Sequence, residues 1–397
     1  MTNWKEIEKK YYMRTFTAVR LPVVLVRGKG AYAWDEAGKK YLDFMAGWAV
    51  NCLGHAPSVV AKALADQSKK LIHTSNQFYT VPQLQLAELL AKNSCMERVF
   101  FGNSGLEANE GAVKLARRYG KLKLNGAYEV ITAMGSFHGR SLAMTAATGQ
   151  ESFHLPYLPM PVGFVNAAYN DIDAIKCATT DKTCAVMLEP IQGESGVIVP
   201  ADDYLKKVRE WCDQKGILLI LDEIQTGIGR LGKMWGYEVY GVEPDIMSIA
   251  KGLAGGVPIG AVMARGKADV FVAGDHGGTF CGNPLACAAG FATMNYILEN
   301  KVVEHVVDVS AYLFEMLKKL KEKYSFITEV RGRGLLIALQ FDSEIAAKVL
   351  MDCLEAGLLV NKPKANVIRL MPPLIITRKD VDLATSIFDK VFSGIKK

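Results

Sequence analysis

A continuous apolar run near the middle of the chain, GILLILD at residues 216–222, constrains the fold more than any other feature. A run without alternation is typical of a strand buried on both faces, and such strands occur mainly in parallel sheets covered by helices. Further short apolar runs occur at residues 98–102, 128–132, 184–189 and 245–250. Helical patterns lie between them, at residues 107–119 and 204–215. This alternation predicts an α/β fold with a mainly parallel sheet and helices on both of its faces.

The last hundred residues follow a different pattern. The expected elements are helices at residues 284–299 and 302–324, strands at 327–331 and 334–340, a helix at 344–355, a strand at 367–370 and a helix after Thr377. Helices and strands that no longer alternate regularly predict a smaller α+β domain. We therefore expect an N-terminal segment of residues 1–50, a large domain of residues 51–290 and a small domain of residues 291–397. The N-terminal segment is expected to pack on the small domain or on a partner subunit.

Composition excludes several classes of protein. Half of the 397 residues are apolar and 22% are charged, which favours a large buried core over disorder. The net charge is +6, but no run of Lys or Arg is long enough for a nucleic-acid-binding arm. The eight cysteines include no C-x-x-C pair, so neither a metal site nor a disulfide framework is expected. The N-terminus lacks the apolar core of a signal peptide, and no stretch is long enough to span a bilayer, which predicts a soluble cytoplasmic protein.

Two residues of opposite charge, Asp222 and Lys251, each stand at the C-terminal end of a predicted buried strand. In an open parallel sheet the ligand crevice lies outside the carboxyl ends of the strands, so both side chains are candidates to face one ligand. Pyridoxal-phosphate chemistry needs such a pair: a lysine that binds the cofactor as an imine, and a carboxylate opposite the pyridine nitrogen. The alternative for this pair alone is a structural ion pair or two unrelated surface residues.

The segment NSGLE at residues 103–107 lies between a predicted strand and a predicted helix. Ser104 and Glu107 fit a capping box, and the free N–H groups of such a helix start form an anion site suited to a phosphate. An ordinary capped helix is the alternative interpretation of this segment.

Three loops add candidate residues. In FHGR at residues 137–140, Phe137 is suited to stack on a flat cofactor, and Arg140 offers a fork that matches a carboxylate. Glu194 follows a strand and is placed to pair with a cation, and GGTF at residues 277–280 has a flexible backbone and a hydroxyl for phosphate. Solvated loops and turns are the alternative in each case.

Together these segments resemble the class-III aminotransferase family, which acts on ornithine, acetylornithine and 4-aminobutyrate. The matching stretches are FFGNSGLEANEGAVKLAR, FHGR, LEPIQGESG, LDEIQTGIGR, PDIMSIAKGLAGGVPIG, GGTFCGNP and VIRLMPP, in order from residue 100 to residue 373. The pairing of LDEIQTGIGR with PDIMSIAKG is highly specific to that family. The resemblance implies a pyridoxal-phosphate fold-type I enzyme with a mainly parallel seven-stranded sheet, plus the smaller α+β domain.

The resemblance also implies roles for residues around the cofactor ring. Lys251 would be the Schiff-base lysine, and Asp222 would pair with the pyridine nitrogen. Gln225 would donate a hydrogen bond to the phenolic oxygen of the ring. Phe137 and Ile224 would lie on the two faces of the ring.

Further implied residues concern the phosphate. Gly105 and Leu106 would offer backbone N–H groups to it, and Thr279 of the neighbouring subunit would complete the site, which implies a homodimer with shared active sites. Ser104 and Glu223 are also expected among the cofactor-binding residues. Leu106 stands where the family commonly has Thr, so the backbone N–H alone remains there.

The substrate residues implied by the resemblance are Arg140, Glu194, Gly278 and Arg369. Arg140 and Arg369 would bind the carboxylates of the amino donor and of 2-oxoglutarate or glutamate. Glu194 would neutralise Arg369 while the donor is bound and swing away for glutamate. The expected function is transfer of the δ-amino group of acetylornithine to 2-oxoglutarate, in arginine biosynthesis.

Two alternatives remain open. One is another ω-amino donor: ornithine, succinylornithine, succinyldiaminopimelate or 4-aminobutyrate. Gly278, where acetylornithine enzymes often have Ser, bears on that choice. The other is a binding or regulatory protein of the same fold that has lost transaminase activity.

Overall fold

A computed structural model describes residues 4–13, 15 and 20–395. Residues 1–3, 14 and 16–19 of the predicted N-terminal segment lie outside the described residues. The largest sheet has seven strands in the order β4 (Arg98–Gly102), β10 (Gly260–Ala264), β9 (Ile246–Ile249), β8 (Leu218–Asp222), β7 (Thr183–Leu188), β5 (Glu129–Ala133) and β6 (Phe164–Ala167). Adjacent strands from β9 to β6 are all parallel, as predicted. β10 is antiparallel to both of its neighbours, which makes β4 parallel to the other strands.

The apolar run at residues 216–222 forms β8, and alternate side chains face opposite sides of the sheet. Leu218 and Ile220 belong to the core on the side of α5 (Gly105–Lys123), and Leu219 and Leu221 to the core on the other side. Gly216, predicted within the strand, instead ends α9 (Tyr204–Lys215) in the left-handed conformation (φ 68°), which glycine adopts without steric cost. Both faces of the sheet are therefore buried, which explains the absence of alternation in the sequence.

Strands β6 and β10 were not predicted. Both are short, and β10 (GAVMA) is built partly of small residues with low strand propensity. Strand β10 therefore runs opposite to the other strands of the large sheet, and the apolar pattern of the sequence does not predict it.

The C-terminal part forms an antiparallel sheet in the order β11 (Ile327–Arg333), β12 (Leu336–Phe341), β15 (Val367–Leu370) and β14 (Asn361–Lys364). The long helices α11 (Pro284–Glu299) and α12 (Val302–Lys323) lead into it, and α13 (Ala346–Glu355) and α14 (Arg378–Ser393) complete it. Thr377 caps α14 in a capping box with Asp380, as the predicted start after Thr377 requires. The predicted elements of this region are confirmed, whereas the division of the chain at residues 50 and 290 stays a prediction.

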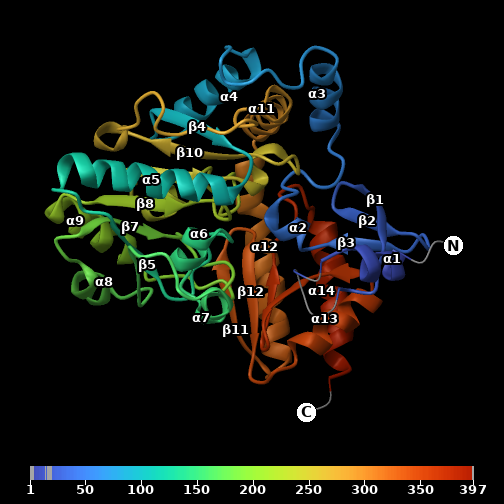
Figure 1. Ribbon diagram of the computed structural model, residues 1–397. Coiled ribbons are helices and arrows are strands. Elements are labelled where there is room, and N and C mark those ends of the chain that lie inside the picture. Colours follow the sequence, from blue (N-terminus) through green and yellow to red (C-terminus); the bar gives the residue numbers. More distant parts are fainter. Residues whose placement is uncertain (1–3, 14, 16–19, 396–397) are drawn as a thin grey trace.

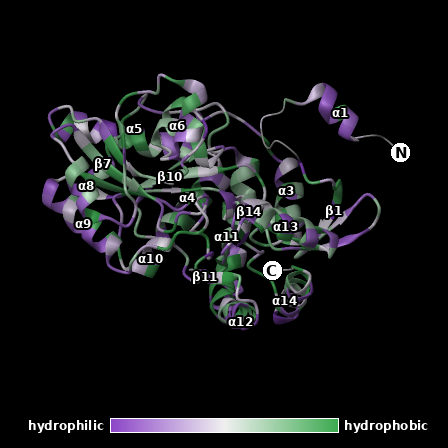
Figure 2. Ribbon diagram, turned by 90° about the horizontal axis from the view of Figure 1, so that it is seen from below, coloured by the Kyte–Doolittle hydropathy of each residue, from purple (hydrophilic) through white to green (hydrophobic). Residues whose placement is uncertain are grey.

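The N-terminal strands form a third sheet with a strand from the C-terminal region. Its order is β1 (Leu25–Lys29), β2 (Tyr32–Asp35), β3 (Lys40–Asp43) and β13 (Leu358–Leu359), and β3 pairs in parallel with β13. Figure 1 shows these blue strands beside the red α13 and α14. Helix α1 (Trp4–Tyr11) buries no residue and lies apart from the main body (Figure 2).

The remaining helices are short or cover the edges of the large sheet. They are α2 (Ala46–Ala49), α3 (Ser58–Ser68), α4 (Val81–Lys92), α6 (Leu142–Ala147), α7 (Glu151–His154), α8 (Ile172–Ala178), α10 (Gly236–Tyr240) and the 3₁₀ turns η1 (Leu155–Tyr157), η2 (Lys251–Ala254) and η3 (Gly266–Ala268). Within the described part of the chain, no helix combines the length and the apolar character needed to cross a membrane.

Candidate active site

A cavity of about 520 Å³ lies at the carboxyl edge of the large sheet. This is the edge at which a doubly wound sheet binds its ligands, because the loops after the parallel strands meet there. The predicted site residues that line it are Ser104, Gly105, Leu106, Phe137, Arg140, Glu194, Asp222, Ile224, Gln225 and Lys251. They come from the segments that follow β4, β5, β7, β8 and β9, so the fold brings together residues spread over more than a third of the chain.

Lys251 stands at the start of η2, directly after β9, in the left-handed region (φ 42°). That conformation is strained for a residue with a side chain, and such strain is concentrated at functional sites. Its ammonium forms no hydrogen bond or ion pair with the residues that the structure describes. Burial lowers the pKa of Lys251, and Arg369 lowers it further against the opposite effect of Glu194. The amine is therefore more readily deprotonated than an ordinary lysine, as a nucleophile requires.

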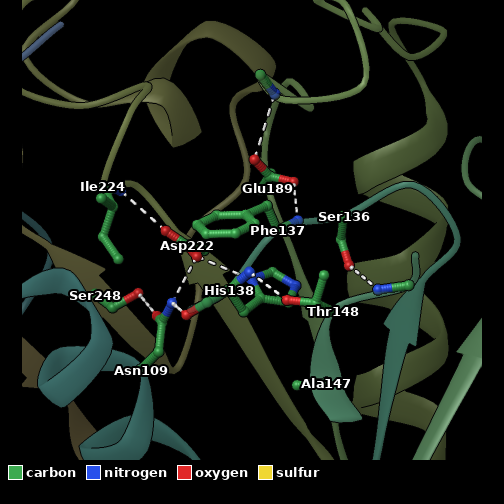
Figure 3. Close-up of polar contacts among 12 residues, drawn as sticks. Asn109, Ser136, Phe137, His138, Ala147, Thr148, Glu189, Asp222, Ile224 and Ser248 are labelled. Carbon is green, nitrogen blue, oxygen red and sulfur yellow. Dashed lines mark hydrogen bonds and ion pairs between the residues drawn. The ribbon is translucent and has the colours of Figure 1, made fainter. Parts of the chain in front are cut away.

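The carboxylate of Asp222 is held by donors from three elements (Figure 3). Its Oδ2 accepts hydrogen bonds from Asn109 Nδ2 and from His138 Nδ1, both at 2.8 Å, and its Oδ1 accepts from Ile224 N at 3.0 Å. Only 3% of Asp222 is exposed. Because a carboxylate can only accept, His138 must carry its proton on Nδ1. Asp222 is thus an oriented anion that retains acceptor capacity on Oδ1.

Two buried polar residues that sequence reasoning missed complete this network. Asn109 Nδ2 also donates to the His138 carbonyl at 2.7 Å, and Ser248 Oγ donates to Asn109 Oδ1 at 2.5 Å. Asn109 lies on a helix face of Ala and Val, and Ser248 lies inside an otherwise apolar strand. In both segments a polar residue stands at a position that the apolar pattern predicts to be buried. Because buried polar groups nearly always have a hydrogen-bond partner, these two positions could have been recognised from the sequence as parts of a polar network.

The first turn of α5 forms one end of the cavity. Ser104 caps the helix, with its Oγ accepting from Glu107 N at 3.2 Å. The predicted capping box is only half formed: the Glu107 carboxylate accepts from Asn103 N at 2.5 Å and Asn103 Nδ2 at 2.8 Å, two donors in place of the single Ser104 N–H. The N–H groups of Gly105 and Leu106 belong to the first turn, which has no intrahelical acceptors, so they are available to an anion.

Arg369 is fully buried and lies behind Glu194. Arg369 Nη1 forms an ion pair with Glu194 Oε1 at 2.8 Å and lies 3.4 Å from Gln225 Oε1. Burial alone would raise the pKa of Glu194, but Arg369 and Lys251 hold it below its ordinary value. Arg369 does not line the cavity whereas Glu194 does, so a ligand reaches Arg369 only if Glu194 moves.

Arg140 lies at the exposed side of the cavity. Its guanidinium stands 5.5 Å from the centre of the Phe137 ring and 4.3 Å from that of Phe153, which meet edge to face. These two rings orient a cation that remains accessible to a ligand.

Glu189 is a buried carboxyl of the cavity wall that sequence reasoning did not select. Its two oxygens accept from Phe137 N at 3.2 Å and from Gly193 N at 3.3 Å, as Figure 3 shows for Phe137. Burial raises the pKa of Glu189 to about 7, and Asp222 adds to the effect. Glu189 therefore links the loop that carries Phe137 to the turn that carries Glu194.

Besides Arg369, three further predicted residues do not line the cavity. The Glu223 carboxylate accepts from Gly236 N and Tyr237 N, both at 2.6 Å, so it holds the start of α10 and is not brought into the site. Successive side chains after a strand point in opposite directions, so Asp222 faces the cavity and Glu223 faces away. Gly278 and Thr279 lie in an exposed loop outside the cavity of their own chain.

Comparison with known proteins supports this description. The family model described as aminotransferase class-III matches residues 15–392. A relative from Caldanaerobacter subterraneus, named acetylornithine aminotransferase, is 48% identical over 98% of this chain and 99% of its own length. Another of that name, from Methanocaldococcus jannaschii, is 47% identical over 100% of this chain and 99% of its own length.

Solved structures give the same result. The ornithine aminotransferase from Toxoplasma gondii superposes with a TM-score of 0.94 at 34% identity, covering 98% of this chain and 94% of that chain. The acetylornithine aminotransferase from Elizabethkingia anophelis gives a TM-score of 0.87 at 35% identity, covering 99% and 98%. Sequence, fold and site geometry agree, and the chain belongs to the class-III aminotransferase family.

Proposed function

We propose that this protein is an acetylornithine aminotransferase that uses pyridoxal phosphate to transfer the δ-amino group to 2-oxoglutarate, a step of arginine biosynthesis. The observation that carries this proposal is that Lys251 and Asp222 line one cavity together with Glu194, which covers the buried Arg369. The names of the full-length relatives support the choice of donor. Lys251 and Asp222 in the cavity fit the cofactor, and Arg369, paired with Glu194 of the cavity lining, fits a substrate that carries a second carboxylate.

The residues present fit pyridoxal phosphate. Gln225 Nε2 is a buried donor without a hydrogen-bond partner of good geometry among the described residues, and it matches a phenolic oxygen. Asp222 Oδ1 keeps acceptor capacity for a protonated pyridine nitrogen. The N–H groups of Gly105 and Leu106 suit the phosphate, and Phe137 and Ile224 offer apolar surface to the ring. When bound, the cofactor supplies an electron sink for the carbanion formed at the amino-bearing carbon.

The protein's own groups move and hold the protons. Lys251, with its lowered pKa, takes the proton from the carbon next to the donor's nitrogen and later returns it. Asp222, oriented by Asn109 and His138, would be the carboxylate that pairs with the ring nitrogen of the cofactor. The reaction runs in two halves, with glutamate leaving in the second, so ping-pong kinetics are expected.

The two arginines sort the substrates. Arg140 is accessible and would bind the carboxylate of the donor. The Glu194–Arg369 ion pair carries no net charge and would not attract that carboxylate. 2-Oxoglutarate brings a second carboxylate, which replaces Glu194 at Arg369. This arrangement discriminates by charge, since an unpaired buried arginine would bind the wrong end of the donor.

The active unit in this proposal is a homodimer with shared sites, in the cytoplasm. Thr279 and Gly278 are exposed and lie outside the cavity of their own chain, so a partner subunit is needed to bring a second copy of them to it. Exposed aromatic side chains beside this loop, Phe78, Tyr79 and Phe280, supply apolar surface for such an interface.

A single-turnover experiment tests the proposal. Purified, cofactor-loaded protein is mixed with acetylornithine, ornithine or 4-aminobutyrate, and conversion of the bound cofactor to its amine form is followed by absorbance. Acetylornithine should react fastest at equal low concentration. Faster reaction with another donor would replace the assigned substrate and would point to Gly278. If no donor reacts and Lys251→Ala leaves the spectrum unchanged, the aminotransferase assignment fails.

A further inference from the structure

The guanidinium of Arg369 has a second contact that faces away from Glu194. Asn361 Oδ1 accepts from Arg369 Nε at 3.0 Å and from Arg369 Nη2 at 2.7 Å. Arg369 offers only donors, so the contacting atom of Asn361 must be its oxygen, and the orientation of the amide is fixed. Arg369 is thus held on two sides, by a carboxylate at Nη1 and by a neutral amide oxygen along the Nε–Nη2 edge.

The strand register places Asn361 there. Asn361 on β14 and Arg369 on β15 are directly opposite in an antiparallel pair, and β15 pairs in turn with β12, which is buried except at Gln340. A cross-strand partner is as fixed as the sheet itself. Glu194, in contrast, sits on a turn, and its side chain is 31% exposed. One partner of Arg369 therefore lies on a paired strand of the sheet, and the other lies on a partly exposed turn.

We infer that Asn361 is a positioning and specificity-determining residue: it fixes Arg369 in place while leaving its charge uncancelled, so that a substrate carboxylate can replace Glu194. This inference rests on the proposed function and deepens it. When Glu194 leaves, Asn361 keeps two of the guanidinium N–H groups satisfied, and the Nη1 and Nη2 end stays aimed at the incoming carboxylate. An aspartate at the same position would pair with Arg369 permanently, and an apolar residue would leave buried donors unpaired.

The decisive variant is Asn361→Asp, which keeps the shape of the side chain and adds one negative charge. Binding of glutarate, a dicarboxylate that cannot accept an amino group, is measured by calorimetry on the cofactor-loaded protein, with pentanoate as the monocarboxylate reference. Asn361→Asp should weaken glutarate binding by about tenfold or more, the loss expected for one charge-assisted interaction. Pentanoate binding and the donor half-reaction should change much less than glutarate binding, because Glu194 already neutralises Arg369 in that state.

Asn366→Asp is the matched control, since it adds the same charge to the same hairpin away from Arg369. A double variant separates positioning from a merely structural role. Glu194→Gln should leave Arg369 unneutralised and slow the donor half-reaction, and adding Asn361→Asp should restore that half-reaction.

Unchanged glutarate binding in Asn361→Asp, or no restoration in the double variant, overturns the inference. The outcome is separable from that of the proposed function. Glutarate binding that depends on Asn361, in a protein that reacts with no ω-amino donor, would refute the proposed reaction and still support the role of Asn361.

Discussion

At the scale of single residues, the site depends on the direction in which each carboxylate points. Asp222 and Glu223 are neighbours in sequence and both are buried. Asp222 accepts from Asn109, His138 and Ile224 N and faces the cavity. Glu223 accepts from Thr226 and from two backbone N–H groups at the start of α10. Asp222 is therefore available to a ligand in the cavity, whereas Glu223 holds the start of α10.

Removal of the Glu223 carboxylate should cost stability and spare the cofactor. Glu223→Ala leaves the N–H groups of Gly236 and Tyr237 buried without acceptors, so the free energy of unfolding should fall by about 2 to 4 kcal/mol. Urea unfolding measures this, and Glu210→Ala on the exposed face of α9 is the control. The affinity for pyridoxal phosphate, measured by absorbance titration, should not change. A folded variant that no longer binds the cofactor would show instead that Glu223 contributes to cofactor binding.

For Asn109 we expect the opposite of the result for Glu223, namely a loss of affinity for the cofactor. Asn109→Asp places a second carboxylate 2.8 Å from Asp222 Oδ2, and two adjacent carboxylates favour uptake of a proton. The pair would then be a poorer partner for a protonated ring nitrogen, and the affinity for the cofactor should fall by about tenfold or more. Asn125→Asp, in an exposed turn, controls for the added charge. Equal cofactor affinity in the two variants would show that Asn109 does not tune Asp222.

At the scale of elements, the cavity exists because the ends of separate strands and helices are held against each other. Strand β10 starts at Gly260, where a β-carbon would lie 2.1 Å from the Ser104 carbonyl oxygen. The strand therefore touches the helix start that is proposed to bind phosphate. Glu189 links the loops after β5 and β7 in the same way, through hydrogen bonds to Phe137 N and Gly193 N.

Gly260→Ala should push the start of α5 out of place. The expected result is a loss of about 1 to 3 kcal/mol in the free energy of unfolding, as for other overpacked sites. Weaker binding of pyridoxal phosphate, which depends on the N–H groups of Gly105 and Leu106, should accompany it. Gly394→Ala, where the added carbon meets its nearest neighbour at 3.4 Å, is the control. Weaker binding without loss of stability, or the reverse, would show that β10 and the helix start are not coupled.

The buried carboxyl of Glu189 predicts that the free energy of unfolding depends on pH. Burial raises the pKa of Glu189 to about 7, so the folded protein retains a proton there that the unfolded chain releases at its ordinary pKa of 4.5. The stabilisation is present below that ordinary value and is lost as the pH rises to about 7. The free energy of unfolding of the wild type, minus that of Glu189→Gln, should therefore decrease from pH 5 to pH 8. A difference that does not vary with pH would contradict the raised pKa.

At the scale of the whole molecule, the loop with Thr279 is exposed and does not line the cavity of its own chain. Asn76 Nδ2 donates to the carbonyl oxygens of Gly278 and Cys281, so this loop is attached to the segment that carries exposed Phe78 and Tyr79. His73 and Phe280 add a ring contact at 5.3 Å. An exposed loop supported in this way suits a surface that another subunit covers.

Mixed subunits test whether the sites are shared. Lys251→Ala and Thr279→Glu should each have little activity as pure proteins, the second because its carboxylate would repel the phosphate. In a mixed dimer, one site would combine the intact Lys251 of one subunit with the intact Thr279 of the other, and activity should reappear. No recovery in a sample whose mixed dimers are verified by native mass spectrometry would mean that Thr279 does not act across an interface.

The sequence by itself determined the class of fold and most of the predicted site residues that line the cavity. Buried parallel strands, capped helices and motifs near strand ends are local patterns, and a parallel sheet gathers strand ends at one edge whatever its exact packing. Lys251, Asp222, Gln225 and Phe137 follow from these patterns and from the family resemblance, and the structure places all four on one cavity.

Only the tertiary structure decided which polar residues support these groups. Asn109 and Ser248 contact partners far away in the sequence, and Asn361 contacts Arg369 on the neighbouring strand, so their roles depend on the order of the strands and on the β14–β15 register. The orientation of Glu223 and the cover that Glu194 gives to Arg369 likewise depend on packing between distant segments. Local patterns fix which elements form, whereas contacts between elements are fixed only when the core is packed.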